Sequence, residues 1–355
     1  MHIWQTCFKW VDILPFSIGF LTYGDLPPSR LISLARLLEE LGYSWLWHAD
    51  EKFHRDPWVT LPLIAKSTNQ LGLGIAVTEP YSRHPALIAM AIATLAELAP
   101  NRLILGLGAG GPGFPAMGID RTHPAQTLRD AIGIIRSMLS GKASNLNSEI
   151  LTTRNAKLSF ESLAEIPIVL GTRSKYILQL AGELADGVMT AAFASPQGLN
   201  HALDNVNIGA KKRTNTTDFF HKICRVDLCI DDNIANAYEA VKPGIALPLW
   251  ANFPNFKFLE PLGLLPVPKN LYRVLEKRDY NLMLEKAYLV PDNYIRHMVV
   301  AGNQEQVINQ MVQIIQTGVN QITIRPVPSS ASTVESILTQ FSKEILPEVL
   351  KQHPV

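Results

Sequence analysis

The chain has 355 residues, of which 47% are hydrophobic, and its 32 Lys and Arg nearly balance its 31 Asp and Glu. A net charge of +1 excludes the basic surface that binding to nucleic acid or to an anionic membrane requires. Two apolar segments, residues 13–21 and 243–268, adjoin or contain charges, and the second contains several prolines, so we expect neither to be a membrane signal. Three cysteines without an even framework favour a reduced cytoplasmic protein.

Strand-like and helix-like segments alternate along the chain. The expected strands are residues 16–21, 45–47, 71–77, 103–107, 168–170, 188–190, 223–230 and 321–325. The expected helices include residues 57–68, 84–98, 124–139, 175–185 and 196–211, with a first one between Pro27 and Gly42 and a last one between Asn303 and Gly318. About eight such alternations predict one (β/α)8 TIM barrel domain over residues 1–355. A doubly wound open sheet is the structural alternative.

Residues 240–291 depart from this alternation. They are rich in proline and aromatic side chains, and they show no clear periodicity until about Leu271. A long connection in a compact domain is usually functional, and this one is too aromatic for a disordered segment. We expect an insertion that covers the barrel mouth and shapes the substrate pocket. A hydrophobic packing surface or dimer surface is the alternative.

A glycine-rich loop follows the fourth expected strand. The run from Gly106 to Gly111 matches G-x-G-x-x-G, but Pro112, Gly113 and Pro115 follow where a dinucleotide fingerprint would open a helix, which argues against that motif. The remaining candidates are Gly108, Ala109, Gly110 and Gly111, whose bare backbone N–H groups can approach an anion closely. The alternative is a tight turn without a ligand.

A similar loop follows the next expected strand. Gly171, Thr172 and Arg173 precede a helix, so backbone N–H groups at its N-terminus and the Arg173 guanidinium suit a phosphate. The alternative is an ordinary turn with a solvated arginine.

Acidic residues follow the second expected strand. Asp50 and Glu51 stand at the carboxyl end of that strand, where barrel enzymes place catalytic groups, and this position favours an acid–base role. His48 and His54 lie nearby, but neither an H-E-x-x-H pattern nor a cysteine pair accompanies them, so we expect no metal site.

Four blocks in chain order resemble the luciferase-like monooxygenase superfamily. They are ADEKFHRDPWVTL, GIAVTEPYSRHPAL, IATLAELAPNRLILGLGAGGPG and IPIVLGTRSKYILQLAGELADGVM, and the C-terminal MVVAGNQEQVINQMVQIIQTGVNQITIRP fits as well. Within the superfamily, AVTEPYSRHPA followed by LGLGAGG resembles the branch of methylenetetrahydromethanopterin-reductase-like proteins. The resemblance covers nearly the whole chain. It implies a (β/α)8 barrel that holds a flavin or the deazaflavin coenzyme F420 at its mouth.

The resemblance also implies roles for particular residues. Asp50 and Glu51 would line the polar edge of the deazaflavin. Ala76 and Val77 would form a cis peptide in a strand bulge that supports the ring, and the two glycine loops, 108–111 and 171–173, would hold the phosphate-bearing tail. Two positions differ from relatives in the superfamily. Gly19 stands where the reductases have an acidic residue, and Glu51 stands where the sugar-phosphate dehydrogenases have a histidine.

The resulting expectation is an F420-dependent oxidoreductase that transfers a hydride, in either direction, between the deazaflavin and a small or medium organic substrate. Such proteins are expected to form homodimers. One alternative is an FMN-dependent two-component monooxygenase that is supplied by a flavin reductase. Another is a non-catalytic flavin-binding protein, because the acidic group expected at Gly19 is missing.

Overall fold

The computed structural model describes residues 16–162, 165–214 and 219–352. Eight parallel strands follow the order β1–β2–β3–β4–β7–β8–β9–β11, and β11 pairs with β1 to close a barrel. The strands are β1 (Ser17–Thr22), β2 (Trp45–His48), β3 (Gly72–Thr78), β4 (Leu103–Leu107), β7 (Ile168–Gly171), β8 (Gly187–Ala191), β9 (His221–Ile230) and β11 (Gln321–Pro326). The closed ring confirms the predicted (β/α)8 barrel and excludes the alternative of a doubly wound open sheet.

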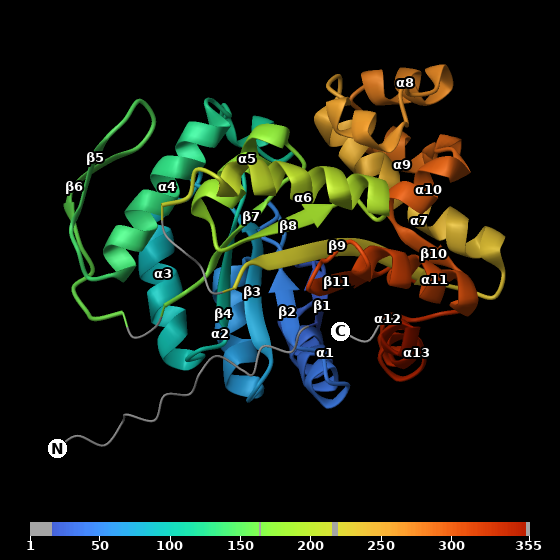
Figure 1. Ribbon diagram of the computed structural model, residues 1–355, viewed down its shortest axis with the longest axis horizontal. Helices are drawn as coiled ribbons and strands as arrows, with labels where there is room; N and C mark the ends of the chain where they lie inside the picture. Colours follow the sequence, from blue (N-terminus) through green and yellow to red (C-terminus); the bar gives the residue numbers. More distant parts are fainter. Residues whose placement is uncertain (1–15, 163–164, 215–218, 353–355) are drawn as a thin grey trace.

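Helices surround the barrel (Figure 1). They include α1 (Pro28–Glu40), α2 (Pro57–Ser67), α3 (Pro85–Leu98), α4 (Pro124–Leu139), α5 (Lys175–Leu184), α6 (Pro196–Ala210), α7 (Ile234–Asn252) and α11 (Gln304–Ile315). Several begin with proline at the first helical position, where its missing N–H costs no hydrogen bond. Asn303 and Gln306 form the predicted capping box of α11.

The inside of the barrel is filled by side chains. A separate inner cluster contains Leu21, Trp47, Ile104, Val169, Met189 and Ile223. The much larger cluster lies between the strands and the helices. Because the barrel interior is packed, ligands must bind at the rim, beyond the carboxyl ends of the strands.

The first part of segment 240–291 is helical, whereas an irregular connection was expected there. The helix runs from Ile234 to Asn252, although Pro243 and Pro248 lie inside it. Its buried face contains Ala237, Val241, Ile245 and Leu249, which recur every four residues and are fully buried. This packing outweighs the backbone hydrogen bonds that the prolines remove. Short helices follow it: η2 (Lys257–Leu262), α8 (Lys269–Glu276), α9 (Tyr280–Glu285), η3 (Ala287–Leu289) and α10 (Asp292–Met298).

Three strands outside the barrel were not predicted. β5 (Ser144–Asn147) and β6 (Thr152–Ala156) form an antiparallel hairpin between α4 and β7, at the side of the molecule opposite α8–α10 in Figure 1. β10 (Val300–Gly302) pairs with the far end of β9. All three strands are short, which explains why their sequences gave no clear alternation.

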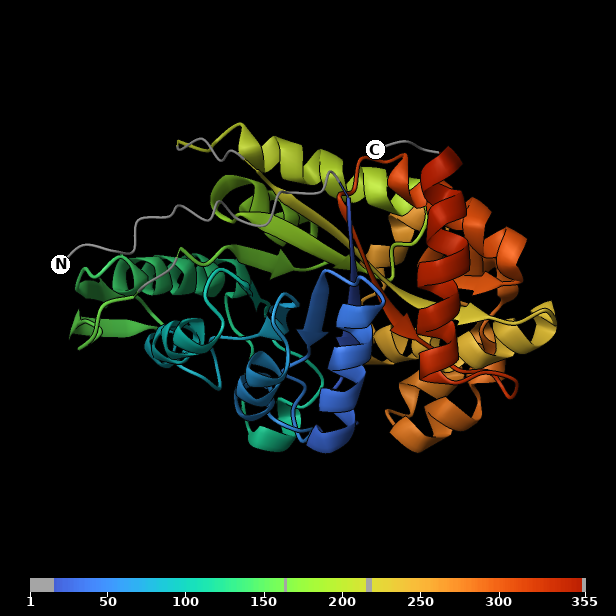
Figure 2. The same ribbon diagram turned by 90° about the horizontal axis from the view of Figure 1, so that it is seen from below.

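The C-terminal helices pack next to the first helix (Figure 2). α12 (Val334–Gln340) leads through a π-helical turn (Phe341–Ile345) into α13 (Leu346–Gln352). Tyr43 Oη donates a 3.0 Å hydrogen bond to the Leu338 carbonyl, and Ser342 Oγ donates one of 2.6 Å to the Leu41 carbonyl. These contacts attach the C-terminal helices to the segment that follows α1. In the described parts of the chain, no helix combines the length and apolar character needed to cross a bilayer.

Candidate active site

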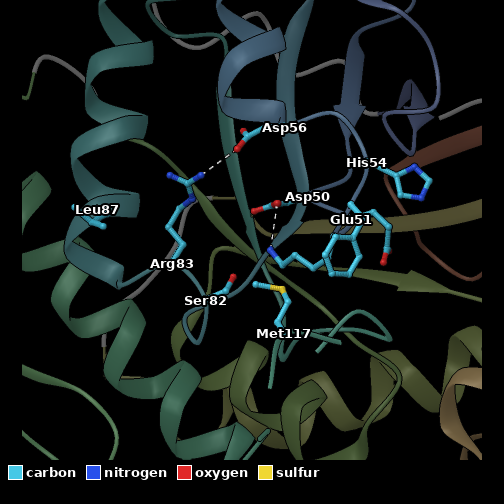
Figure 3. A pocket seen from close by; sticks show the side chains of 10 residues that line it. Asp50, Glu51, His54, Asp56, Ser82, Arg83, Leu87 and Met117 are labelled. Atoms are coloured by element: carbon cyan, nitrogen blue, oxygen red, sulfur yellow. Dashed lines mark hydrogen bonds and ion pairs between the residues drawn. The ribbon is translucent and has the colours of Figure 1, made fainter. Parts of the chain in front are cut away.

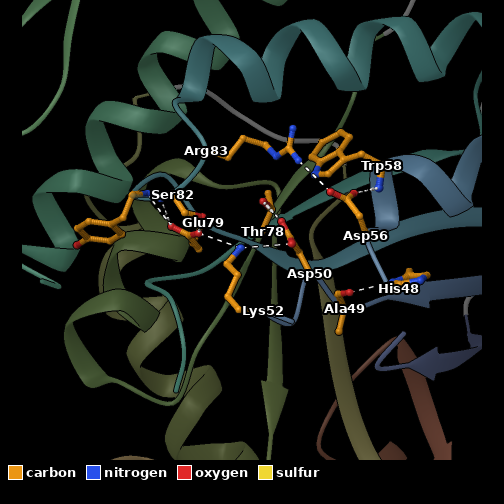
Figure 4. Close-up of polar contacts among 11 residues, drawn as sticks. His48, Ala49, Asp50, Lys52, Asp56, Trp58, Thr78, Glu79, Ser82 and Arg83 are labelled. Atoms are coloured by element: carbon orange, nitrogen blue, oxygen red, sulfur yellow. Dashed lines mark hydrogen bonds and ion pairs between the residues drawn. The ribbon is translucent and has the colours of Figure 1, made fainter. Parts of the chain in front are cut away.

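Asp50 lies at the centre of a polar network just beyond β2 (Figure 4). Thr78 Oγ1, at the end of β3, donates a 2.6 Å hydrogen bond to Asp50 Oδ2. Lys52 Nζ lies 3.3 Å from Asp50 Oδ1 and 3.0 Å from Glu79 Oε1. All of these charged side chains are at least 87% buried. The ammonium therefore compensates two carboxylates in a weakly solvated place, which fixes the position of both.

Glu79 is held from its other side by the turn that follows β3. Its Oε2 accepts hydrogen bonds from the backbone N–H groups of Tyr81, at 2.7 Å, and Ser82, at 2.9 Å, and the Ser82 hydroxyl donates to Oε1. Lys52 and Glu79 were not singled out from the sequence. The signal was present, since Glu79 directly follows β3 and Lys52 comes four residues after the end of β2.

The histidines near Asp50 do not join this network. His48 is fully buried, and its Nδ1–H donates a 2.8 Å hydrogen bond to the Ala49 carbonyl. Burial lowers the pKa of His48 and favours the neutral ring. His54 is exposed. Throughout the described residues, no group of three His, Cys, Asp or Glu side chains is arranged to hold a metal ion.

Glu51 occupies a different position from Asp50. It is half-buried and lines two neighbouring pockets, one with Asp50, Lys52, Ser82 and Arg83, shown in Figure 3, and one that extends across the barrel mouth. Burial raises the pKa of Glu51, while the nearby His54 and Lys52 partly oppose that shift. A carboxyl that is easier to protonate and faces open space can exchange a proton with a bound molecule.

Ala76 and Val77 form the predicted irregularity in β3. Their peptide bond is cis, and the register between β3 and β4 shifts between Ile75 and Thr78. Both residues are half-buried, whereas the rest of β3 is buried. The bulge therefore presents a small apolar surface at the barrel rim, as the family resemblance implied.

The glycines beside this bulge leave room for the Val77 side chain and for the bulged backbone. A Cβ atom at Gly108 would lie 2.4 Å from Val77 Cγ2, and one at Gly171 would lie 2.6 Å from Val77 Cγ1. A Cβ at Gly106 would lie 2.0 Å from the Ile75 carbonyl oxygen. These three positions must be glycine for the strands to accommodate the bulge.

Gly110 and Gly111 have different reasons to be glycine. Gly110 has φ +85°, and a Cβ there would lie 2.1 Å from Phe114 Cζ, so the turn itself requires it. A Cβ at Gly111 would have only Glu51 Oε1 nearby, at 3.9 Å. The exposed Gly111 backbone, next to the half-buried Ala109, thus faces open space beside Glu51.

The second glycine loop leads into α5. Thr172 Oγ1 accepts a 2.9 Å hydrogen bond from the Ser174 backbone N–H, so this hydroxyl shapes the start of the helix. The Arg173 side chain leaves the loop toward the pocket across the barrel mouth, where its guanidinium lies 5.0 Å from the centre of the Phe258 ring. Burial lowers the pKa of Arg173 to about 10.

Gly19 has no room for the acidic residue of the reductases. A Cβ there would lie 2.8 Å from Thr323 Oγ1 and 3.2 Å from Trp47 Cδ1. The large Trp47 side chain fills this part of the barrel and is fully buried. The acidic group is therefore replaced by indole packing.

Two further side chains near the rim cap helices. His84 Nδ1 accepts a 3.1 Å hydrogen bond from the Ala86 backbone N–H and caps α3, while Asp56 accepts one of 2.7 Å from the Trp58 backbone N–H and caps α2. Asp56 also forms an ion pair with Arg83, at 3.2 Å.

Comparison with known proteins places this barrel in a family. The sequence profile of the luciferase-like monooxygenases matches residues 13–321. The chain belongs to the luciferase-like monooxygenase family. Among its relatives, the 5,10-methylenetetrahydromethanopterin reductase of Archaeoglobus fulgidus is 30% identical over 95% of this chain and 100% of its own length. An F420-dependent glucose-6-phosphate dehydrogenase of Amycolatopsis mediterranei is 24% identical over 91% of this chain and 95% of its own.

Solved structures agree on the fold of this luciferase-like protein. The coenzyme F420 dependent tetrahydromethanopterin reductase from Methanopyrus kandleri superimposes with a TM-score of 0.82 at 24% identity, covering 94% of this chain and 99% of its own. A monooxygenase from Streptomyces bottropensis gives a TM-score of 0.65 at 16% identity, covering 93% and 99%. The F420-dependent reductase is thus the nearer of these two in shape.

Proposed function

We propose that this luciferase-like protein is an F420-dependent oxidoreductase that transfers a hydride between the deazaflavin and a small or medium organic substrate. The relatives that match over nearly the whole chain include proteins described as F420-dependent. The observation that carries the proposal is that three features adjoin one another at the rim of the barrel. The Ala76–Val77 bulge lies between the two glycine loops, through Gly108 and Gly171, and the Asp50 network, through Thr78.

These residues fit a flat ring with an anionic tail. The bulge offers an apolar support for the ring, and Asp50 offers a fixed polar edge. The backbone of Ala109, Gly110 and Gly111 and that of Gly171, Thr172 and Arg173 leave N–H groups for the phosphate of the tail. When bound, the coenzyme supplies the hydride chemistry, and the chain supplies binding and orientation.

Glu51 is the proposed proton-exchanging group. It faces open space on both sides, unlike Asp50, whose two oxygens are engaged by Thr78 and Lys52. The chain lacks the acid that the reductases place at Gly19, so a carboxyl from the β2 end takes over that task in this proposal. Asp50 positions Lys52 and the polar edge of the site.

The first test is a fluorescence titration of the purified protein with oxidised F420 and, separately, with FMN. Micromolar or tighter binding of F420 alone is the expected result. Preference for FMN would overturn the proposal in favour of a two-component monooxygenase, which oxygen uptake with reduced FMN and a flavin reductase would then establish. Tight F420 binding without turnover on any substrate would favour a non-catalytic binding protein, consistent with the lost acid at Gly19.

We also propose a homodimer and a substrate-shaping insertion. Exposed apolar side chains gather on α2 and α3, among them Val59, Leu63, Leu87 and Met90. Pairing of this surface would remove it from water. The segment 240–291 contributes Gly244, Ile245, Leu247, Pro248 and Ala251 to the pocket across the barrel mouth. Light scattering of the purified protein tests the dimer.

A further inference from the structure

Three arginines converge on the pocket across the barrel mouth. Arg225 comes from β9, Arg325 from β11 and Arg173 from the loop after β7, and all three line the pocket together with Tyr23 and Asp227. Arginine side chains carry their charge at any ordinary pH, so a group of three in one partly buried pocket is costly without anions. The net charge of the pocket therefore depends on which carboxylates pair with these arginines.

Asp227 compensates two of the three arginines. Its side chain is 2% exposed, and Oδ2 lies 2.6 Å from Arg325 Nη2 while Oδ1 accepts a 2.8 Å hydrogen bond from Arg325 Nε. Oδ1 also lies 2.6 Å from Arg225 Nη2. One carboxylate therefore faces two guanidinium groups, and the cluster of Arg225, Asp227 and Arg325 keeps a charge of +1.

Arg225 retains unused hydrogen-bonding capacity. Its side chain is 11% exposed, and Nη2 donates a 3.0 Å hydrogen bond to the Tyr23 hydroxyl. Its Nε is buried and, within the described residues, meets no hydrogen-bond acceptor. The two guanidinium carbons of Arg225 and Arg325 lie 5.5 and 5.3 Å from the centre of the Tyr23 ring, which holds the cluster together through cation–π contacts.

Arg173 adds a second uncompensated charge. In the described part of the chain, its guanidinium makes no hydrogen bond or ion pair with a protein side chain, and only the Phe258 ring covers one face. Glu51 is the other acidic residue in the pocket, and burial disfavours its charged form. The pocket therefore keeps a positive charge of +1 to +2 and several free N–H donors.

Arg225 on β9 and Arg325 on β11 lie across the barrel mouth from the strands that carry the Ala76–Val77 bulge and the first glycine loop. In the eight-stranded ring, β9 lies four strands from β3, and β11 lies four strands from β4. The arginines of β9 and β11 thus face the bulge and the first glycine loop from the opposite side of the mouth. Apolar side chains, including Ile245, Leu247 and Met298, line the rest of the pocket.

We propose that Arg173, Arg225 and Arg325 bind an anionic group, a carboxylate or a phosphate, of a substrate whose remaining body is apolar. The proposal rests on the proposed function for the identity of the reaction, but the anion site itself does not require it. Arginine N–H groups match the planar oxygens of a carboxylate and the oxygens of a phosphate. The apolar lining then orients the body of the substrate toward the bulge.

The test compares ligands that share one body and differ in the head group. Hexanoate, hexyl phosphate and hexan-1-ol are titrated into the full-length protein by calorimetry. At least one of the two anions should bind about tenfold or more tightly than the alcohol, the effect expected of one charge-assisted hydrogen-bond pair. The stronger of the two identifies the head group. Equal binding of all three ligands would overturn the proposal.

Variants locate the binding to the arginines. Arg225→Gln should weaken the preferred anion about tenfold, and Arg225→Lys should recover part of the loss because it restores the charge without the planar fork. Arg36→Gln, an exposed position on α1, is the matched control and should change nothing. If Arg225→Gln does not fold, Arg225→Lys is measured alone and should still weaken the preferred anion, since it keeps the charge but loses the planar fork. Unchanged anion binding in the folded variant would overturn the proposal.

Coenzyme titration separates this proposal from the proposed function. Arg225→Gln should bind F420 as the unmodified protein does. A matching loss of F420 affinity would show that the arginines hold the coenzyme's own anionic tail, which overturns the substrate assignment. If the unmodified protein binds hexanoate or hexyl phosphate in an Arg225-dependent way but binds no F420, the anion site stands and the proposed function fails.

Discussion

Gly111 faces Glu51 across open space: a Cβ atom at Gly111 would lie 3.9 Å from Glu51 Oε1 and would contact nothing else beyond its chain neighbours. Gly111→Val should therefore fold normally but block the approach of a ligand to this backbone, weakening F420 binding about tenfold or more, which is about 1.4 kcal/mol. Fluorescence titration measures the change. Gly133→Val, on the exposed side of α4, is a control with equally open surroundings.

An unchanged F420 affinity in Gly111→Val would show that the loop is only a turn. Gly110 is less suitable for this test. Its positive φ and the nearby Phe114 ring mean that any side chain there would disturb the loop itself.

Glu51→Gln should lower turnover far more than it lowers coenzyme affinity. Glutamine keeps the shape of the side chain but cannot exchange a proton, and a positioned acid–base group contributes about 10²-fold or more to rate. The measurements are kcat with a substrate in excess and the Kd for F420. Equal turnover in the variant would remove Glu51 from the mechanism and would return attention to Asp50.

Glu51 should also make stability depend on pH. Burial raises its pKa in the folded protein above the ordinary 4.5, so the folded state binds more protons than the unfolded state between those values. The stability associated with the protonated carboxyl is complete below pH about 4.5 and is lost as pH rises through the folded pKa. The Glu51→Gln variant has no carboxyl at this position, so its stability should not fall in this way as pH rises. Urea unfolding at pH 4.5 and pH 7 should show the variant gaining stability relative to the unmodified protein at the higher pH.

The same stability difference at both pH values would contradict that prediction. It would mean that the Glu51 carboxyl is solvated equally in the folded and unfolded states.

Lys52→Met should destabilise the protein by about 2–4 kcal/mol, because it leaves the buried carboxylates of Asp50 and Glu79 without their shared cation. Methionine is of similar length, so the loss is mainly one of charge. The free energy of unfolding in urea is the measurement. Lys66→Met, at an exposed position on α2, is the matched control and should change stability by less than about 0.5 kcal/mol. Similar effects of the two substitutions would show that the network contributes nothing to stability.

Much of the barrel was predictable because its parallel strands are short apolar runs that end in polar or glycine residues. The Ala76–Val77 bulge was also predicted, but through the family resemblance and not through the residues themselves. Single-sequence patterns could not show why Gly108 and Gly171 are glycine, since the reason is Val77 on a different strand. Contacts between neighbouring strands are set by the closed barrel and leave no local trace in the sequence.

The candidate site was predicted only where its residues adjoin one another in the chain. Asp50 and Glu51 share one loop, and both lie at the rim. Arg225, Asp227 and Arg325 were not singled out, because the ion pair that joins Asp227 to Arg325 spans 98 residues between β9 and β11. The α7 helix was missed because its two internal prolines argued against a helix. The apolar residues that recur every four positions are recognisable as a helix face only once their burial is known.

Gly244 is where α7 approaches that ion-paired cluster. A Cβ atom there would lie 2.3 Å from Asp227 Oδ2 and 3.0 Å from Arg325 Nη2. Gly244→Ala should push the helix away and lower stability by about 1–3 kcal/mol, the usual cost of overpacking. The same substitution at Gly133, also helical but with nothing within 4 Å, should raise stability by about 0.5–1 kcal/mol because alanine favours the helix. Urea unfolding compares the two variants. Stabilisation by both would mean that α7 does not pack directly on the ion pair of Asp227 and Arg325.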